Sequence, residues 1–410
     1  MRRVVITGMG CVSALGVTAQ QTWSGMRDGR SGITPLTGLD DDSLRTPVAA
    51  QAKAFVAAEH FDEKRLVLLD PVSQFALVAA REAVAQSGLN FAGAQAQRSE
   101  LGDRTAVIIG TGIGGASTQD QMARRLYAER NPRVHPMTIV RVMPNAPASQ
   151  ISLEFGLRGP VFAVASACAS SNHALGQALM LLRSGAADLA LAGGSEACIT
   201  VGTVKAWEAM RVMADDTCRP FSSGRRGLVL GEGAAVFVLE TLEHAQARGA
   251  TILAELAGAG MTADATDIVM PDASGATRAM RGALEQAGLA LQDVDYINAH
   301  GTGTQVNDAT ETKAIRALFG AHADALAVSS TKGGHGHALG AAGAIELVAV
   351  LGAMAESVVP PTLNYLRPDP ACDLNVVPLM AQQRPVRAAL SNSFAFGGLN
   401  AVLALKRWSE

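Results

Sequence analysis

Residues 161–185 read VFAVASACASSNHALGQALMLLRSG, an apolar run followed by small residues and then an amphipathic segment. The run Val161–Val164 predicts a buried strand, and the leucines and alanines after it recur at helical spacing until Gly185. Cys168 therefore lies at the start of the predicted helix, where unpaired N–H groups and the helix dipole favour a thiolate over a thiol. The alternative is a small buried apolar residue, as isolated cysteines usually are.

The composition predicts a large α/β protein. The chain has 410 residues, of which 48% are hydrophobic, only 4% are aromatic and 42 are glycine, so we expect a core of closely packed small side chains. A net charge of −3 without clustered basic charge gives no indication of nucleic-acid binding. The 5 cysteines lack CxxC spacing, which argues against a zinc knuckle or a disulfide framework. We expect a reduced, cytoplasmic setting.

Neither the N-terminus nor the most apolar segment predicts membrane targeting. The start, MRRVVITGMG, passes from two arginines directly into a strand pattern, with no long apolar region and no cleavage site. Residues 337–354 are apolar but contain Glu346 and many glycines and alanines. We expect this segment to be a core helix of a soluble protein and not a membrane span.

The chain contains two similar series of predicted strands. The first series comprises residues 4–8, 105–110, 161–164, 189–193 and 235–239, and the second comprises residues 252–256, 296–299, 327–329, 389–392 and 402–405. In each series the third strand is followed by a helix rich in small residues, 168–184 or 337–354. We expect two similar α/β halves, residues 1–250 and 251–410, with the two central helices between sheets. Two further segments are expected to be insertions that carry specificity, residues 112–150 and 195–232.

The run GTGIGG at residues 110–115 matches the GxGxxG pattern after a predicted strand. A dinucleotide site also needs a first βαβ position and an acid about 20 residues further on, and neither condition is met. We interpret the run as a tight turn in which Ile113 lines a cavity.

Two histidines occupy positions where a catalytic acid, base or hydrogen-bond donor could lie. His300 directly follows a predicted strand in the glycine- and threonine-rich loop NAHGTGT, where a general acid or hydrogen-bond donor would lie, although a lone histidine there is more often structural. His337 begins the central helix of the second half, as Cys168 begins that of the first. If a pseudo-twofold axis relates the halves, the two helix N-termini meet and Cys168, His300 and His337 share one pocket.

Nine short motifs occur in one order along essentially the whole chain: VVITGMG, GTGIGG, SACASSNHA, AGGSEA, RPF with GLVLGEGA, NAHGTGTQVND, STK with GHALGAAGA, VVPPTLNY with PDPACDLN, and NSFAFGGLN. In this order they resemble the elongating β-ketoacyl-acyl carrier protein synthases of the thiolase-fold superfamily. The resemblance implies two βαβαβαββ halves in a layered α/β/α/β/α fold, with the nucleophile in the first half and both histidines in the second.

The resemblance also implies a decarboxylating Claisen condensation that uses no metal and no redox cofactor. Cys168 matches the nucleophile that takes an acyl group from a phosphopantetheine thioester. The backbone N–H groups of Cys168 and Phe396 match the oxyanion hole. His300 and His337 match the pair that points N–H donors at the enolate oxygen formed when malonyl-carrier protein loses CO₂. Two histidines after the cysteine fit elongation of a carrier-bound chain.

Four other polar residues lie in the matching motifs. Lys332 and Glu311 match positions that support the histidines through hydrogen bonds, although both could equally belong to a structural ion network. His173 matches a position that is structural in the family. His335 lies in a Gly-Gly-His run where many relatives have Ser-Met-Thr, and its role is open.

Several residues depart from the family pattern around the acyl tunnel, whose expected walls are Ile113, Leu228 and Phe396. Leu228 stands where many fatty-acid synthases have phenylalanine, and Arg226 replaces an acid. Ala395 replaces a flexible glycine beside the gating Phe396, and alanine does not readily adopt positive φ, so we expect a restricted gate. These departures favour a specialised pathway that makes polyketide, polyene or nodulation-type acyl chains.

The implied partner is an acyl carrier protein, which is acidic, so basic residues near the pocket mouth would steer docking. The candidates, each of which alone is better explained as a solvated surface charge, are Lys64, Arg65, Arg124, Arg125 and Arg130. We expect a homodimer around the third strand of the first half, with residues 112–145 reaching toward the partner. The alternative is a heterodimer with a catalytically silent homologue.

Two other functions remain open. The first is a non-catalytic chain-length or scaffold subunit of the same fold, which the intact Cys168, His300 and His337 disfavour. The second is a thiolase acting on coenzyme A esters, which the histidine of GHALGAAGA and the NSFAFGG terminus disfavour.

Overall fold

The computed structural model describes residues 1–39, 41–91 and 99–409. Ten strands form one mixed sheet in the order β10-β9-β13-β14-β8-β1-β7-β6-β4-β5. In the first half these strands are β1 (Val4–Val12), β4 (Thr105–Gly110), β5 (Val161–Val164), β6 (Leu189–Glu196) and β7 (Gly233–Thr241). In the second half they are β8 (Ala254–Ala263), β9 (Tyr296–Asn298), β10 (Ala327–Ser329), β13 (Ala388–Ala395) and β14 (Leu399–Arg407).

The two halves of the sheet repeat one topology outward from the junction of β1 and β8. The orders β1-β7-β6-β4-β5 and β8-β14-β13-β9-β10 both consist of two antiparallel pairings followed by two parallel ones. The expected pseudo-twofold repeat is therefore present. The half-sheets are also continuous, because Val5 pairs with Glu255 and Ile6 pairs with Ala254 across the junction.

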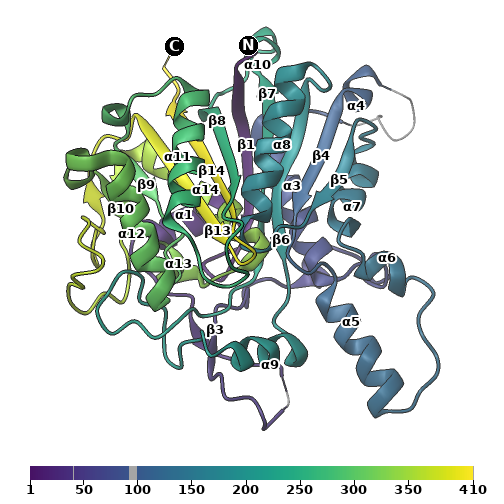
Figure 1. Ribbon diagram of the computed structural model, residues 1–410. Helices are drawn as coiled ribbons and strands as arrows, with labels where there is room; N and C mark the ends of the chain where they lie inside the picture. Colours follow the sequence, from purple (N-terminus) through teal and green to yellow (C-terminus); the bar gives the residue numbers. More distant parts are fainter. Residues whose placement is uncertain (40, 92–98, 410) are drawn as a thin grey trace.

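Two helices fill the space between the half-sheets. Helix α8 (Ser170–Ser184) contacts β4 and β6 of its own half and β8 and β14 of the other, while α14 (Ala342–Glu356) contacts β13 and β9 and also β7 and β6. On the outer faces, α3 (Pro71–Ser87) and α7 (Ala146–Phe155) cover the first half-sheet, and α11 (Ala273–Ala287) covers the second with α12 (Gln305–Phe319) packed on it. The layers are α/β/α/β/α, as expected (Figure 1).

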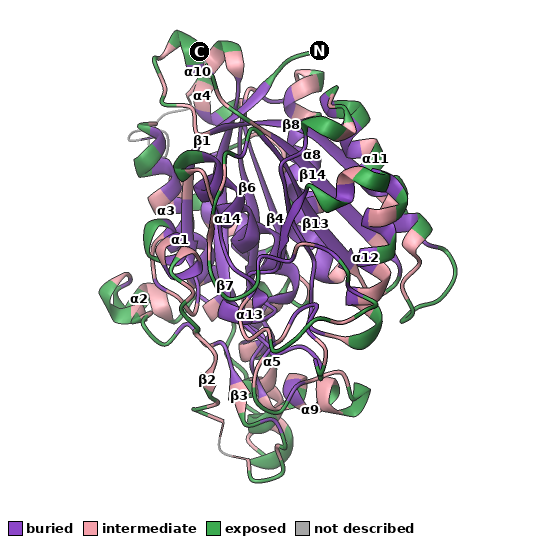
Figure 2. Cartoon of the chain, turned by 90° about the vertical axis from the view of Figure 1, so that its left-hand side faces the viewer, coloured by how far each residue is buried: buried purple, intermediate pink, exposed green. Residues whose placement is uncertain are grey.

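Helix α14 is a core helix. Residues 342–354 are all buried, and Figure 2 shows the helix in the buried centre of the molecule. Among the described residues, one helical stretch is long and apolar enough to cross a membrane, Leu339–Glu356, and 89% of it is buried inside the protein. Apolar residues on every face of a helix indicate burial on every face, which the two flanking half-sheets provide.

Paired glycines bring the outer helices close to the sheet in both halves. A Cβ on Gly8 or Gly10 of β1 would overlap the carbonyl oxygens of Ala83 and Ala79 on α3. In the second half, Gly258 and Gly260 of β8 face the carbonyl oxygens of Ala283 and Ala279 on α11 in the same way. Both halves therefore use the same glycine-on-alanine contact between their first strand and the outer helix that packs on it.

The remaining elements lie outside this repeat. The helices are α1 (Ala19–Arg27), α2 (Glu63–Leu66), α4 (Glu100–Asp103), α5 (Ala116–Ala123), α6 (Thr138–Val142), α9 (Val201–Met210), α10 (Leu242–Ala247) and α13 (Lys332–His335). The strands are β2 (Thr34–Pro35), β3 (Val48–Ala49), β11 (Val358–Val359) and β12 (Gln382–Gln383). Figure 1 shows α5 and α6 projecting from the layered body. The expected insertion 112–150 extends too far, because residues 146–150 belong to α7, which lies between β4 and β5 in the repeat.

Both central helices begin later than the periodicity predicts. Cys168 lies in the single 3₁₀ turn Ala167–Ala169, and α8 starts after it at Ser170. His337 precedes the 3₁₀ turn Leu339–Ala341, and α14 starts at Ala342. Short tight turns commonly lead into α-helices, and apolar spacing does not distinguish them from the helix itself.

Candidate active site

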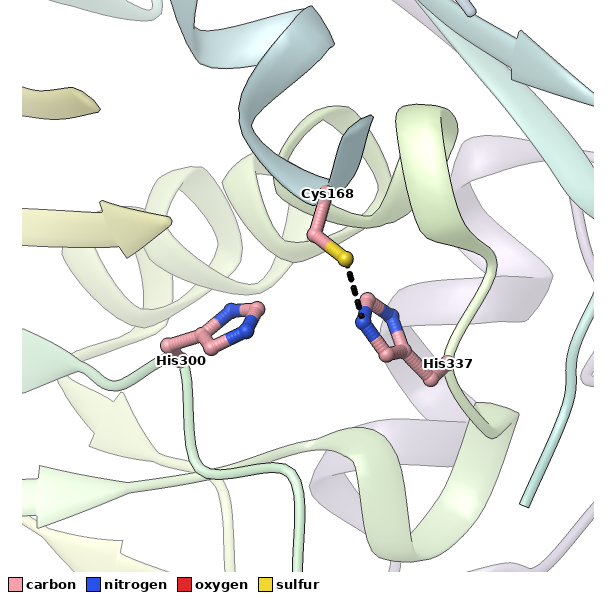
Figure 3. Close-up of side chains that lie close together, drawn as sticks. All are labelled: Cys168, His300 and His337. Carbon is pink, nitrogen blue, oxygen red and sulfur yellow. Dashed lines mark hydrogen bonds between the residues drawn. The ribbon is translucent and has the colours of Figure 1, made fainter. Parts of the chain in front are cut away.

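Three buried side chains from separate elements face one another (Figure 3). Sγ of Cys168 lies 3.1 Å from Nε2 of His337, and the rings of His300 and His337 lie 5.3 Å apart between centroids at 81°. The sulfur and one ring nitrogen of each histidine all lie within 4.8 Å of one another. The structure thus brings together the nucleophile and both histidines that the sequence singles out.

The turn that carries Cys168 is fixed by backbone contacts. Ala167 has a positive φ of 48°. Oγ of Ser170 accepts a hydrogen bond from the N–H of Ser166 and donates one to the Ala167 carbonyl, at 2.8 and 2.7 Å. Gly110 at the end of β4 lies so close to the backbone of Ser170 that a Cβ would overlap it. These contacts place Cys168 at the point where β5 gives way to α8.

His337 is held on both sides by the GLVL segment of the first half. Its N–H donates to the Val229 carbonyl at 2.7 Å, and its own carbonyl accepts from the N–H of Gly231 at 2.9 Å. Residues Leu230 and His337 form a parallel bridge. A motif of the first half therefore positions a histidine of the second.

Burial sets the ionisation of all three groups. Burial raises the pKa of the Cys168 thiol to about 12, while the charge of Lys332 lowers it by less. Desolvation of the buried sulfur is the largest cause of this shift and favours the thiol, the opposite direction from the expected effect of the helix N-terminus. Burial and then Lys332 also lower the pKa of His300 and the pKa of His337 well below the usual histidine value. The resting site therefore holds a thiol and two neutral imidazoles.

Lys332 determines which nitrogen of His300 carries the proton. Nζ of Lys332 donates to the His300 carbonyl at 2.5 Å, to Nδ1 of His300 at 3.5 Å and to the carboxylate of Glu346. An ammonium group only donates, so Nδ1 of His300 accepts and the ring proton lies on Nε2. Glu311 acts on the backbone instead of the ring, because its carboxylate accepts from the N–H groups of His300 and Gly301 at 2.9 and 2.8 Å. Burial raises the pKa of Glu311 to about 7.

Two buried glutamates near the reactive group were not predicted from the sequence as site residues. Glu346 forms the ion pair with Lys332, and neither side chain is exposed. Glu196 accepts hydrogen bonds from the N–H groups of Gly112 and Gly340 at 2.6 and 3.0 Å, so it joins the turn after β4 to the start of the α14 segment. Burial raises the pKa of each carboxyl to about 7. The available signal was a single acid in an otherwise apolar run, AGGSEA or AGAIELV.

One pocket contains the three reactive side chains. Its other lining residues include Leu228, Trp207, Val269, Phe394, Ala395 and Phe396. The ring of Phe396 stacks on Trp207 at 5.8 Å between centroids and 27° between planes. Ile113 does not line this pocket, contrary to the tunnel expectation, because it lies in a separate cavity that shares Trp207 with the first.

Ala395 does not occupy the positive-φ position on which the expectation of a restricted gate rests. Ala395 is the last residue of β13 and pairs with Leu399 in the hairpin to β14, so its backbone is extended. The positive φ angles of this turn fall on Gly397 and Gly398, at 85° and 68°. Alanine therefore meets no steric penalty here, and the turn keeps glycine where it needs glycine.

The other histidines make contacts with polar neighbours outside the reactive group. Nδ1 of His173 contacts Oγ of Ser166 at 2.8 Å and the Ala169 carbonyl at 3.1 Å. Nε2 of His335 contacts Oγ1 of Thr331 at 2.9 Å, and burial lowers the pKa of His335 to about 3.

The proposed docking residues lie outside the pocket, on two surfaces. Lys64 and Arg65 are on α2, and Arg65 forms an ion pair with Glu154 at 3.4 Å. Arg124 and Arg125 are in the π-helical turn after α5, and Arg130 follows that turn with a φ of 51°. Arg124, Arg125 and Arg130 are exposed on the projecting arm.

The arrangement is compatible with two chemistries. A thiol beside an imidazole is a nucleophile with an adjacent base, and two neutral imidazoles facing one point are donors for an oxyanion. One cysteine and two histidines are also a donor set that zinc accepts. Comparison with known proteins distinguishes between them.

The family described as beta-ketoacyl synthase matches most of the chain, with its N-terminal domain at residues 1–245 and its C-terminal domain at residues 253–366. Nodulation protein E of Rhizobium sp. (strain N33) is 51% identical over 407 residues, which cover 99% of both chains. 3-oxoacyl-[acyl-carrier-protein] synthase 2 of Staphylococcus aureus (strain COL) is 41% identical over 414 residues, again 99% of both.

Two solved structures share the fold over the full length of both chains. The ishigamide ketosynthase/chain length factor has a TM-score of 0.94 at 34% identity. A type II polyketide ketosynthase bound to its hexaketide, in complex with its acyl-carrier protein, has a TM-score of 0.90 at 31% identity.

Proposed function

Since the chain belongs to the beta-ketoacyl synthase family, we propose that Cys168, His300 and His337 carry out the decarboxylating condensation of that family. The enzyme joins a cysteine-bound acyl chain to malonyl-acyl carrier protein and forms 3-oxoacyl-acyl carrier protein. The observation that carries the assignment of roles is the 3.1 Å contact between Sγ of Cys168 and Nε2 of His337, with His300 facing the same point.

In the first half-reaction, Cys168 takes the acyl chain from a carrier-protein thioester. Sγ attacks the thioester carbonyl, the bond to the phosphopantetheine sulfur breaks, and the thiol proton leaves with that sulfur. Nε2 of His337 is the nearest base, and a thiol with a pKa of about 12 needs one. The backbone N–H groups of Cys168 and Phe396 are proposed to hold the carbonyl oxygen while it carries negative charge.

In the second half-reaction, the malonyl thioester loses CO₂. The electron pair of the broken C–C bond moves into an enolate, whose oxygen accepts from Nε2–H of His300 and of His337. For this step the neutral imidazole of His337 carries its single proton on Nε2 instead of Nδ1, a change of tautomer that exchanges with water once the sulfur is acylated. The enolate carbon then attacks the acyl carbonyl, and the thiolate of Cys168 departs and takes up one proton from solvent, which is the proton that the overall condensation consumes. These steps balance without an external electron carrier, so the proposal includes no redox cofactor and no metal.

Intact-mass measurement tests the assignment directly. After incubation with an acyl-carrier protein, we expect a covalent acyl adduct on the wild-type chain that Cys168→Ala does not form. Decarboxylation of malonyl-carrier protein should be lost in His300→Ala. If the wild type forms no adduct and decarboxylates nothing, the chain is a non-catalytic subunit. Condensation with acetyl-coenzyme A as extender would instead identify a thiolase.

We also propose that the enzyme works in a specialised pathway. The support is its 51% identity to a nodulation protein E against 41% to a 3-oxoacyl-[acyl-carrier-protein] synthase 2. Leu228 in the pocket wall adds to it, because a smaller side chain than phenylalanine leaves more room beside Cys168. A competition assay with acyl-carrier proteins of graded length and unsaturation identifies the preferred chain. Preference for ordinary saturated chains would contradict this placement.

The proposed partners are an acyl carrier protein and a second copy of this chain. The carrier protein is proposed to dock through Arg124, Arg125 and Arg130, and reversing these charges should raise KM more than it lowers kcat. The dimer contact is proposed along β5, an edge strand of the sheet, where Phe162 is 36% exposed and Ile139 on the neighbouring α6 is 65% exposed. Light scattering tests the dimer, and a monomer that pairs with a homologous subunit would indicate the heterodimer.

A cytoplasmic setting is proposed as well. The support is that all five cysteines are unpaired, as expected in a reducing compartment.

A further inference from the structure

A separate cavity lies at the C-terminal end of α14, whereas the reactive group lies before the start of that helix. Its wall consists of the last turns of α14, part of α1, Met9 of β1, the residues before β8, and Arg407 at the end of β14. We name it the α1–α14 cavity, and its volume is about 270 Å³. Among the described residues it shares no lining residue with the pocket of Cys168 or the cavity of Ile113, so it is a site of its own.

The wall of the α1–α14 cavity is mostly apolar. Its large apolar side chains include Met9, Trp23, Leu253, Leu351, Met354 and Trp408. All of these except Trp408 belong to the main buried core or pack against it. An apolar cavity of about 150 Å³ holds a benzene molecule, so 270 Å³ has room for roughly ten carbon atoms.

The Trp23 ring forms a fixed part of this wall. Trp23 is only 2% exposed, and its Nε1 donates to the carboxylate of Glu356 at 2.7 Å. The ring lies directly on α14 at Gly352, where a Cβ would come within 2.2 Å of it. Nη1 of Arg27 donates to the same carboxylate at 2.9 Å, so the charge of Glu356 is already paired. The cavity is therefore preformed, as ligand sites usually are.

One cationic group on the wall has donors to spare. The polar side chains of the wall are Gln20, Glu356 and Arg407, and the amide of Gln20 donates to Oγ of Ser24 at 3.3 Å. Within the described part of the chain, the guanidinium of Arg407 makes a single hydrogen bond, from Nη1 to Oγ of Ser357 at 3.4 Å, and no ion pair. A guanidinium has five N–H donors in a planar fork that matches a carboxylate. An apolar cavity beside such a group is complementary to an alkyl chain that ends in a carboxylate.

We propose that the α1–α14 cavity binds a medium-chain fatty acid, with its alkyl chain against Trp23, Leu351 and Met354 and its carboxylate on the guanidinium of Arg407. The carboxylate lies on Arg407 and not on the last turn of α14, because the C-terminal end of a helix carries partial negative charge. None of the residues that form the site belongs to the group of Cys168, His300 and His337, so the inference does not depend on the proposed condensation.

Tryptophan fluorescence tests this site, because two of the 3 tryptophans of the chain line the cavity. The full-length protein is titrated with decanoate, decanol and decylammonium, each below its micelle concentration. Binding should saturate, and decanoate should bind most tightly. Arg407→Gln should raise the Kd of decanoate about ten-fold, the scale of one charge-assisted hydrogen bond, and leave the Kd of decanol unchanged. Arg281→Gln is the matched control, because Arg281 is an exposed arginine of α11 outside the cavity.

A second variant tests the position of the alkyl chain. Ala355→Phe places a ring into the cavity from α14 and should weaken decanoate and decanol alike. Ala355 and Arg407 are both exposed, so the two variants leave the buried core intact.

Three results would overturn the proposal. One is wild-type affinity for decanoate in both Arg407→Gln and Ala355→Phe. Another is loss of the fluorescence change in Trp207→Phe, which would place the ligand in the pocket of Cys168. The third is an Arg407→Gln variant that is less stable to urea but binds decanoate normally, which would limit Arg407 to supporting the end of α14.

Discussion

The starts of α8 and α14 are equivalent positions in the two halves, yet they carry different chemistry. Cys168 lies two residues before α8 in a turn held by Ser166 and Ser170. His337 precedes the turn that leads into α14. The buried pair of Lys332 and Glu346 acts on both positions, because the charge of Lys332 lowers the pKa of Cys168, of His300 and of His337, in each case less than burial shifts it. The two equivalent positions therefore differ in the side chain that each carries and not in the charges around them.

The largest expected effect on the condensation rate comes from removing the proposed nucleophile, Cys168. Cys168→Ala should lower condensation by roughly 10⁶-fold, the scale seen when a nucleophile is removed. Decarboxylation of malonyl-carrier protein should persist, since both histidines remain. Product formation and CO₂ release, measured on the same sample, separate the two. Cys372→Ala is the control, because Cys372 is buried far from the pocket lining, and loss of CO₂ release in Cys168→Ala would contradict the division of roles.

Removing one of the two proposed histidine donors should slow decarboxylation much more than acyl loading. His300→Ala should lower decarboxylation by about 10²–10³-fold, because one of two donors to the enolate oxygen is lost. Acyl loading should change only a few-fold, since the hydrogen bond to the sulfur in the described part of the chain comes from His337 and not from His300, whereas His337→Ala should impair both steps. Stopped assays of each half-reaction measure this. Equal losses of both steps in His300→Ala would show that the histidines are not specialised.

Removing one charge of the buried ion pair between Lys332 and Glu346 should lower the free energy of unfolding more than removing both charges. Glu346→Gln leaves the ammonium of Lys332 buried and uncompensated, so the free energy of unfolding should fall by about 3–5 kcal/mol. A double variant, Lys332→Met with Glu346→Leu, should recover much of that stability but not the decarboxylation rate. Urea unfolding measures the stability of each. A double variant less stable than Glu346→Gln would contradict the interpretation.

The smallest effect concerns Glu196, which joins the two regions. Burial raises the pKa of its carboxyl from 4.5 to about 7, so the folded chain binds a proton more tightly than the unfolded chain. The contribution is favourable below pH 4.5 and is lost as the pH rises toward 7, with a total of about 3 kcal/mol. Unfolding free energies from pH 4.5 to 7.5 should therefore fall less steeply in Glu196→Gln than in the wild type. Parallel curves would assign the pH dependence to other carboxyls.

The repeat and the reactive residues were predictable from the sequence because local patterns encode them. Strands such as Thr105–Gly110 and Ala327–Ser329 follow from apolar runs, and Cys168, His300 and His337 follow strands within segments of small residues. The protonation state of Cys168 was not predictable, because it depends on how completely distant segments such as Leu228 exclude water. The separate cavity of Ile113 was missed for a similar reason, since only the three-dimensional position of Trp207 divides the space.

Ala395 shows the opposite limit. Its identity suggested a restricted gate, but in the register of β13 with β14 the left-handed positions fall on Gly397 and Gly398. The local sequence alone does not determine which residue of a hairpin turn adopts the positive φ.

The paired glycines of β1 and β8 limit which substitutions the chain can accept during evolution. Gly10 and Gly260 face alanine carbonyls on α3 and α11, so any side chain there would lift a helix off its sheet. Glycine contacts also fix the backbone at the two helix starts, at Gly110 against Ser170 and at Gly340 against Gly112, but the reactive side chains are not part of these contacts, so a duplicated half could exchange its reactive group without disturbing the packing. The contacts of β1 with α3 and of β8 with α11 therefore keep the two halves similar in structure. Sequence differences between the halves are concentrated at the starts of the helices that meet in the pocket.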